Sequence, residues 1–240
     1  MMGTPRGAAV FLGFLMAFLL LGSPAAAGQD ARLGVILGLG FDWETAEYSP
    51  TRCLVGLDLW SPRLEAALAA DVGIPWEPSA SLSFGLLMLD LDWIRIGIDA
   101  RWWMRAYGDI AFEGGASTGV RAEIGSRLLA LSIAGGVSSR LTRFAAIDDP
   151  LEDVVPWARL GAALRPVEAA RFEIAIASDS PLALWLRTSF ELSGSWRFPS
   201  GLRIEGLLAA RYSDFFTLTA HLDGFDARAA VVLPITGGAP

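Results

Sequence analysis

Apolar and polar side chains alternate along several segments of this chain, and this alternation constrains the fold more than any other feature. Between residues 94 and 102, Ile94, Ile96 and Ile98 take one parity, while Arg95 and Asp99 take the other. Segments 182–192 and 202–212 repeat the pattern. Because successive side chains of a strand point to opposite faces, each segment predicts a β-strand with one apolar and one charged side.

The same pattern along the chain predicts an all-β fold of about 12 strands, within a range of about 10 to 14, in one antiparallel domain. The strands are expected at 33–41, 52–60, 63–72, 82–89, 92–103, 118–127, 129–140, 157–165, 171–178, 182–196, 202–212 and 225–235. Segment 215–223 also alternates, and it either extends the last hairpin or joins the final strand through a bulge at Gly224.

The first 27 residues have the composition of a cleavable export signal. Arg6 precedes an apolar stretch at 8–21, and small residues follow up to Ala27. This order predicts cleavage after Ala27 and a mature domain at 28–240. A retained anchor helix is the alternative, although a spanning helix usually needs about 20 apolar residues. The single cysteine, Cys53, lies far downstream, which argues against a lipoprotein and excludes an internal disulfide.

Composition narrows the class of partner. Hydrophobic residues make up 53% of the chain and the mean hydropathy is +0.44, yet no second apolar run is long enough for a membrane helix. The net charge of −7 argues against a nucleic-acid partner, which needs a basic face. All 19 basic residues are arginine. The simplest explanation is a genome that favours arginine codons. A physical reason is that guanidinium groups suit an enclosed ion-pair network.

The links between the expected strands alternate in length. Short links fall at 61–62, 90–91, 128, 166–170 and 197–201, and longer ones at 42–51, 73–80, 104–117, 141–156 and 213–224. The link at 179–181 is short where a long one is due. Two ends that differ in this way are typical of a barrel that crosses a membrane.

Aromatic side chains gather near the expected strand ends. Trp and Tyr concentrate where membrane hydrocarbon meets the lipid headgroups. The residues expected at this interface are Trp60, Trp93, Trp102, Trp157, Trp196 and Tyr212.

Together, the export signal, the alternating segments, the unequal links and the aromatic ends resemble the class of bacterial outer-membrane β-barrels over nearly all of the mature chain. The resemblance is to the class and to no specific family. It implies an up-and-down transmembrane barrel in the outer membrane, with membrane lipids and the barrel-assembly machinery as partners and no cofactor. Proteins of the class commonly end on an aromatic residue. The assembly machinery reads this residue as its signal. In this chain, either a short tail follows a last strand that ends near Ile235, or the assembly signal is unusual.

In such a barrel the polar parity lines the lumen and the apolar parity faces lipid. The network of lumen charges is expected to include Arg95, Asp99, Arg101, Arg121, Glu123, Arg187, Glu191, Arg203, Glu205 and Arg211. The same parity holds Arg159, Arg165, Arg171 and Glu173. Enclosed charges must be paired or hydrated. The arginines predict a constriction that favours anions if water passes, and a structural salt-bridge core is an equal alternative.

Catalytic and metal sites have weak support. The single histidine, His221, is the only candidate base for a serine hydrolase site, with Ser213 and Asp223 nearby, but no nucleophile motif surrounds it. There is no His or Cys cluster for zinc, and the acidic run at 148–153 lacks the glycine spacing of a calcium loop. The glycines at 34–40 share the inward side of the first strand and open no helix, as nucleotide binding would require.

The sequence therefore predicts an outer-membrane barrel that acts as a narrow passive channel or as a structural surface protein, and not an enzyme. One alternative is a lipid hydrolase that uses His221. Another is a soluble periplasmic barrel that binds an apolar ligand, with Ile94, Ile96 and Ile98 turned inward.

Overall fold

The structure, a computed structural model, describes residues 32–44, 51–73, 77–107, 110–146, 150–178, 187–214 and 220–235. The predicted signal peptide and its cleavage site lie outside these residues. Within the described ranges, no helix is long and apolar enough to cross a membrane.

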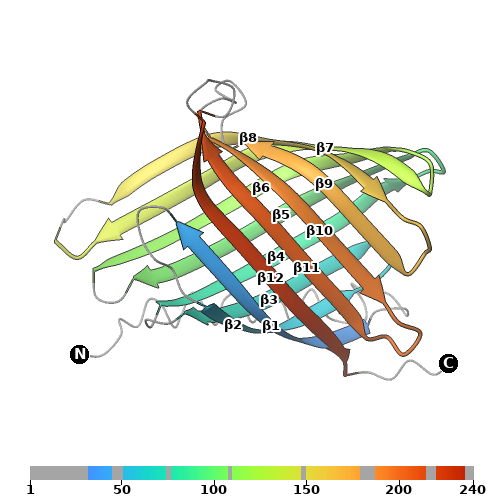
Figure 1. Cartoon of the computed structure of the whole chain (residues 1–240), viewed down its shortest axis with the longest axis horizontal. Helices are drawn as coiled ribbons and strands as arrows, with labels where there is room; N and C mark the ends of the chain where they lie inside the picture. Colours follow the sequence, from blue (N-terminus) through green and yellow to red (C-terminus); the bar gives the residue numbers. More distant parts are fainter. Residues whose placement is uncertain are drawn as a thin grey trace.

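Across the described residues, twelve strands form a closed antiparallel barrel in which each strand pairs with its sequence neighbours and β1 pairs with β12 (Figure 1). The strands are β1 (Arg32–Glu44), β2 (Thr51–Trp60), β3 (Leu64–Gly73), β4 (Glu77–Asp90), β5 (Ile94–Tyr107), β6 (Ala111–Gly125), β7 (Leu129–Phe144), β8 (Leu151–Leu164), β9 (Ala170–Ser178), β10 (Arg187–Arg197), β11 (Arg203–Ser213) and β12 (His221–Pro234). The predicted all-β class, strand number and up-and-down topology are confirmed.

The two ends of the barrel differ in their links. Five tight links, at 61–63, 91–93, 126–128, 165–169 and 198–202, lie at the end where β1 begins and β12 ends, here called the turn end. The opposite end is called the loop end. Serine closes two of the tight links, since the Leu64 N–H donates to Ser61 Oγ (3.0 Å) and the Leu129 N–H donates to Ser126 Oγ (3.1 Å). Gly201 adopts a φ of +85° in the last of them, which favours glycine.

Three expected long links, at 73–80, 104–117 and 141–156, are wrong, because the strands continue through most of each. β3 and β4 pair as far as Gly73 and Glu77. β5 and β6 pair as far as Tyr107 and Ala111, and β7 and β8 pair as far as Thr142 and Leu151. Backbone pairing does not need alternating side chains, so it persists through small residues such as those at 114–117. Segment 221–224 joins β12, with a shift of register beside Tyr212, which agrees with the bulge alternative. Residues 182–186, where a strand was expected to begin, lie outside the described ranges.

The register assigns every strand residue to one of two faces, because directly paired residues share a face. Among described charged side chains in the strands, Arg143 and Glu152 take the apolar face, both at the loop end, and Asp223 lies at the bulge. The other charges share the opposite face. Arg203 on β11 contacts Asp58 on β2 at 2.9 Å, although these strands are not neighbours. Such a contact is made only across the lumen, so the charged face is the interior.

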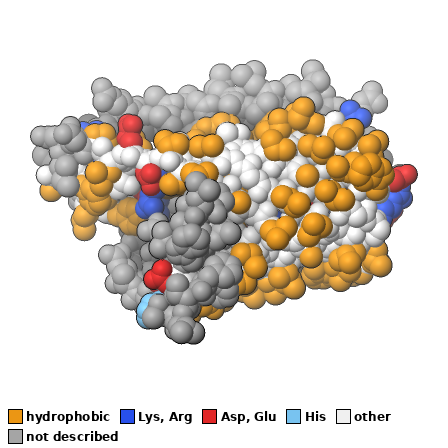
Figure 2. All heavy atoms as spheres, turned by 90° about the horizontal axis from the view of Figure 1, so that it is seen from above, with side chains coloured by type: hydrophobic (Ala, Val, Ile, Leu, Met, Phe, Trp, Pro, Cys, Tyr) orange, Lys and Arg blue, Asp and Glu red, His pale blue; other side chains and the backbone are white. Residues whose placement is uncertain are grey.

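The apolar side chains of the strands cover the outside of the barrel. Leu37, Leu131, Ile174 and Leu208 are among its exposed side chains, and Figure 2 shows apolar atoms along the described part of one face with charged atoms near its ends. Ile98 pairs with Val120 on this outer face. The alternative of a soluble barrel with Ile94, Ile96 and Ile98 inward is therefore wrong.

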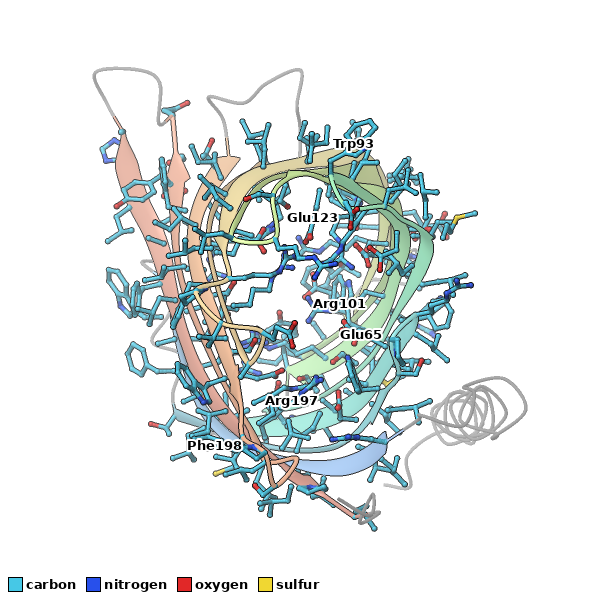
Figure 3. All side chains as sticks on the ribbon, turned by 90° about the vertical axis from the view of Figure 1, so that its right-hand side faces the viewer. Glu65, Trp93, Arg101, Glu123, Arg197 and Phe198 are labelled. Carbon is cyan, nitrogen blue, oxygen red and sulfur yellow. The ribbon has the colours of Figure 1, made fainter. Side chains whose placement is uncertain are left out.

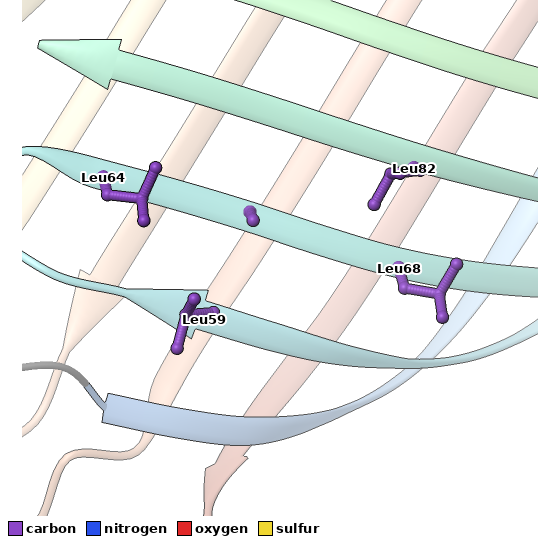
Figure 4. Packing of buried hydrophobic residues seen from close by; sticks show 5 residues of the cluster. Leu59, Leu64, Leu68 and Leu82 are labelled. Atoms are coloured by element: carbon purple, nitrogen blue, oxygen red, sulfur yellow. The ribbon is translucent and has the colours of Figure 1, made fainter. Parts of the chain in front are cut away.

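Buried apolar side chains form two clusters on opposite faces. The cluster in Figure 4 lies on the outward face of β2–β4 and consists of Leu59, Leu64, Ala66, Leu68 and Leu82. The second lies on the inward face and consists of Ile36, Ala230 and Val232, with Leu54 and Ala67 against them. The lumen wall from β12 to β3 therefore carries an apolar patch among its charged side chains.

Candidate functional site

The lumen contains the candidate site. Figure 3 shows Glu65, Arg101, Glu123 and Arg197 inside the ring of strands, while Trp93 lies outside it. The expected network residues with described side chains all take the inward parity. Arg187 pairs with Ser213 through its strand position, and its side chain lies outside the described part of the structure.

Six of the inward side chains form a continuous ion-pair ladder from β6 to β10. Along the ladder they are Arg165, Glu123, Arg171, Glu173, Arg159 and Glu191. Arg171 Nη2 lies 2.6 Å from Glu123 Oε1, and Arg159 Nε lies 2.8 Å from Glu191 Oε2. The side chains of Glu123 and Glu173 are only 7% and 6% exposed. Each buried carboxylate has two guanidinium partners, which offsets its loss of hydration.

A second network crosses the lumen near the loop end. Asp42 on β1 accepts a hydrogen bond from Arg211 on β11 at 2.7 Å and lies 3.8 Å from Arg105 on β5. Beside it, the Tyr107 hydroxyl donates to Glu113 at 2.8 Å. The Asp42 carboxylate thus links β1 with β11 and with β5 on the opposite wall. Polar contacts across the lumen therefore connect the strands at this end of the barrel.

The turn end opens into a vestibule, a cavity of about 710 Å³. Its charged lining comprises Arg95, Arg127, Arg165, Arg171, Arg197 and Arg203, with Glu65 and Glu168. The Arg197 guanidinium stacks on the Trp60 ring, 3.7 Å from its centroid, and Arg203 lies 2.6 Å from Glu205. Five of these arginines have carboxylate partners, so most of the positive charge of the vestibule is paired. The partners are Asp90 for Arg95, Asp92 for Arg127, Glu123 for Arg165, Glu123 and Glu173 for Arg171, and Asp58 and Glu205 for Arg203.

Arg101 occupies the middle of β5 and projects into the lumen (Figure 3). Among the described residues, no carboxylate lies within ion-pair distance of it, whereas Asp99, two positions away, lies 3.6 Å from Arg121. Arg228, Asp226 and Asp71 are near enough for their charges to act on Arg101. Its side chain is nevertheless exposed, because the lumen gives it room for water.

Four of the expected interface aromatics lie on the outside. Trp93 is 62% exposed in the link between β4 and β5, and Trp196 is 43% exposed on β10. Trp102 takes the outward parity of β5. Tyr212 takes that of β11, where it meets Phe190 edge to face with ring centroids 5.8 Å apart.

The expected interface positions of Trp60 and Trp157 are wrong. Both take the inward parity, Trp60 beneath Arg197 and Trp157 on the face of Arg159. A Cβ atom at Gly119 would lie 2.4 Å from the Trp157 ring, so glycine makes room for this indole inside the barrel. Proximity to a strand end does not determine the face, which depends on parity alone.

The arrangement around His221 does not form a catalytic triad. His221 begins β12 opposite Ser213, and the Ser213 hydroxyl donates directly to Asp223 at 3.0 Å. In a triad the imidazole lies between the acid and the nucleophile. Among the described residues there is also no group of three His, Cys, Asp or Glu side chains placed to hold a metal. Of the acidic run, Glu152 and Asp153 are described, and they belong to β8.

Comparison with known proteins supports the fold. No family model matches the chain, and no curated protein matches it. Among solved structures, the KdgM porin in complex with disordered oligogalacturonate has a TM-score of 0.53 at 4% identity, over 85% of this chain and 99% of that one. The NanC porin has a TM-score of 0.49 at 11% identity, over 83% and 98%. The translocator domain of the autotransporter NalP from Neisseria meningitidis has 0.49 at 15%, over 95% and 97%. By its likeness to the KdgM porin, the chain has the fold of an outer-membrane β-barrel, as the class-level resemblance predicted.

Proposed function

We propose that the protein is a passive channel of the outer membrane that passes small anions. Membrane lipids surround its apolar exterior, and the barrel-assembly machinery inserts it. No catalytic role, cofactor or metal is part of the proposal.

Arg101 is the observation on which the proposal depends. A guanidinium without a carboxylate partner, placed midway along a hydrated lumen, lowers the energy of an anion there and raises that of a cation.

A structural surface protein is the second candidate, and the ion-pair ladder favours it. The ladder cross-links β6, β8, β9 and β10 through paired charges that need no solute to satisfy them. If such contacts close the lumen, the barrel is a rigid scaffold.

Conductance across planar bilayers separates the two candidates. We expect the purified protein to carry current, and the reversal potential in a KCl gradient to indicate preference for chloride. Arg101→Glu should shift the preference toward potassium, because it reverses the charge at the midpoint. Arg143→Glu makes the same change on the outer face and should leave the reversal potential unchanged. Zero current from correctly folded protein would leave the structural role.

A further inference from the structure

Arg197 and Glu65 both lie next to Trp60 in the vestibule at the turn end. The Arg197 guanidinium reaches from β10 to β2 and stacks 3.7 Å from the centroid of the Trp60 ring. Glu65 is the residue on β3 that pairs directly with Trp60. Residues paired in this way share a face, and their Cβ atoms lie about 4.5–5.5 Å apart. A guanidinium and a carboxylate therefore adjoin the same indole, although β10 and β3 are not neighbours in the barrel.

These two charges are not paired, either with each other or with any other described side chain. Arg197 is the one arginine of the vestibule lining without a carboxylate partner among the described residues. Glu65 is exposed, and no described guanidinium lies within ion-pair distance of its carboxylate. Both side chains line the same cavity, and Figure 3 shows both inside the ring of strands. The space that they share is therefore open to a solute.

The other charges of the vestibule compete little for such a solute. The remaining five arginines are already neutralised by the carboxylates named above. Glu168, the second carboxylate of the lining, is exposed in the link between β8 and β9, and it does not adjoin Trp60. The volume of about 710 Å³ is within the range of about 300 to 1,000 Å³ that is typical of small-molecule sites. The cavity therefore has room for a ligand beside one free cation and one free anion.

The two free charges select the ligand by its own charges. A simple anion would pair with Arg197, but Glu65 would repel it, and a simple cation would meet the opposite conflict. A solute that carries a carboxylate and an ammonium group satisfies both residues at once. Stacking on Trp60 holds the guanidinium in place before the ligand arrives, which lowers the entropy lost on binding.

We propose that the vestibule binds small zwitterions of the amino-acid type beside Trp60. The carboxylate of the ligand accepts hydrogen bonds from Arg197, and its ammonium group donates to Glu65. The site faces the turn end, so a ligand reaches it whether or not the lumen conducts. This inference goes beyond the proposed channel function and does not depend on it.

Saturation-transfer NMR on the barrel in lipid nanodiscs measures such weak binding without requiring conductance. The probe is L-alanine, compared with N-acetyl-L-alanine, which lacks the ammonium group, and with L-alaninamide, which lacks the carboxylate. We expect L-alanine to bind about tenfold more tightly than either analogue, because each analogue loses one charge-assisted hydrogen bond and meets a repulsive charge.

Two variants assign the two ends of the ligand. Glu65→Gln should weaken L-alanine binding about tenfold and leave N-acetyl-L-alanine bound as tightly or more tightly, because the repelling carboxylate is gone. Arg197→Gln should weaken L-alanine to the same extent and spare L-alaninamide. Because neither residue has an ion pair to lose, we expect both variants to fold, and the heat-dependent shift in electrophoretic mobility checks this.

The matched controls are Glu168→Gln and Arg127→Gln, which make the same changes elsewhere in the lining. Glu168 does not adjoin Trp60, and the Arg127 side chain is 80% exposed beside Asp92. Both controls should leave the affinity for L-alanine unchanged.

The outcomes distinguish this site from the channel. Equal affinity for the three ligands, or the same effect of Glu168→Gln as of Glu65→Gln, would overturn the zwitterion site even in a conducting barrel. Preference for L-alanine that depends on Glu65 and Arg197, in a barrel that carries no current, would support the site while the channel proposal alone fails.

Discussion

Glu123 shows how a single residue supports the lumen. Its carboxylate binds both Arg165 and Arg171, and its side chain is 7% exposed. Glu123→Gln removes the negative charge and leaves two guanidinium groups facing each other. We expect the free energy of unfolding to fall by about 2 kcal/mol, less than for a dry ion pair because the arginines retain access to lumen water. Urea unfolding in lipid vesicles measures the change.

The matched control for this residue is Glu152→Gln. Glu152 lies on the outward face at the loop end of β8, where it is exposed. Exposed charges contribute little, so the control should unfold as the natural protein does. Equal stability of the two variants would mean that the ion-pair ladder does not stabilise the barrel.

At the scale of elements, the packing of β6 against β7 depends on one glycine. A Cβ atom at Gly136 would lie 1.9 Å from the Thr118 carbonyl oxygen, and backbone atoms cannot move aside as a flexible side chain can. Gly136→Ala should destabilise the barrel by about 2 kcal/mol. At Gly135 the nearest atom to a Cβ would be 3.4 Å away. Gly135→Ala should therefore be nearly neutral in the same urea titration, and a reversed order would contradict this packing.

The bounds of the elements were the least predictable part of the fold. The alternation identifies the middle of each strand, where one face meets lipid and the other meets charge. At residues 114–117 the side chains are small on both faces, so the pattern fades while β6 still pairs with β5. Hydrogen bonds between backbones, which carry no sequence signal there, extend the hairpin.

At the scale of the whole molecule, the orientation of the two faces is testable by thiol labelling. In a Cys53→Ser background, Leu208→Cys places a thiol on the outer face of β11 and Ala209→Cys places one inside. In lipid vesicles, a membrane-impermeant maleimide should label position 209 and spare position 208, because lipid excludes the reagent. Labelling of position 208 alone would reverse the assigned faces.

Closure of the barrel creates the candidate site. Arg203 and Asp58 are 145 positions apart, and they meet because β11 and β2 curve toward each other around the lumen. Parity in the sequence places these residues inside, but it carries no information about which of them face each other.

The sequence by itself determined the class, the number of strands and the inward parity of the charges, because a period of two is a local property of extended backbone. Only the tertiary structure decided which carboxylate neutralises which arginine, that Arg101 keeps no such partner among the described residues, and that Trp60 and Trp157 lie inside. These outcomes depend on register and curvature around the closed sheet. Those quantities are set by all the strands together and by no single segment.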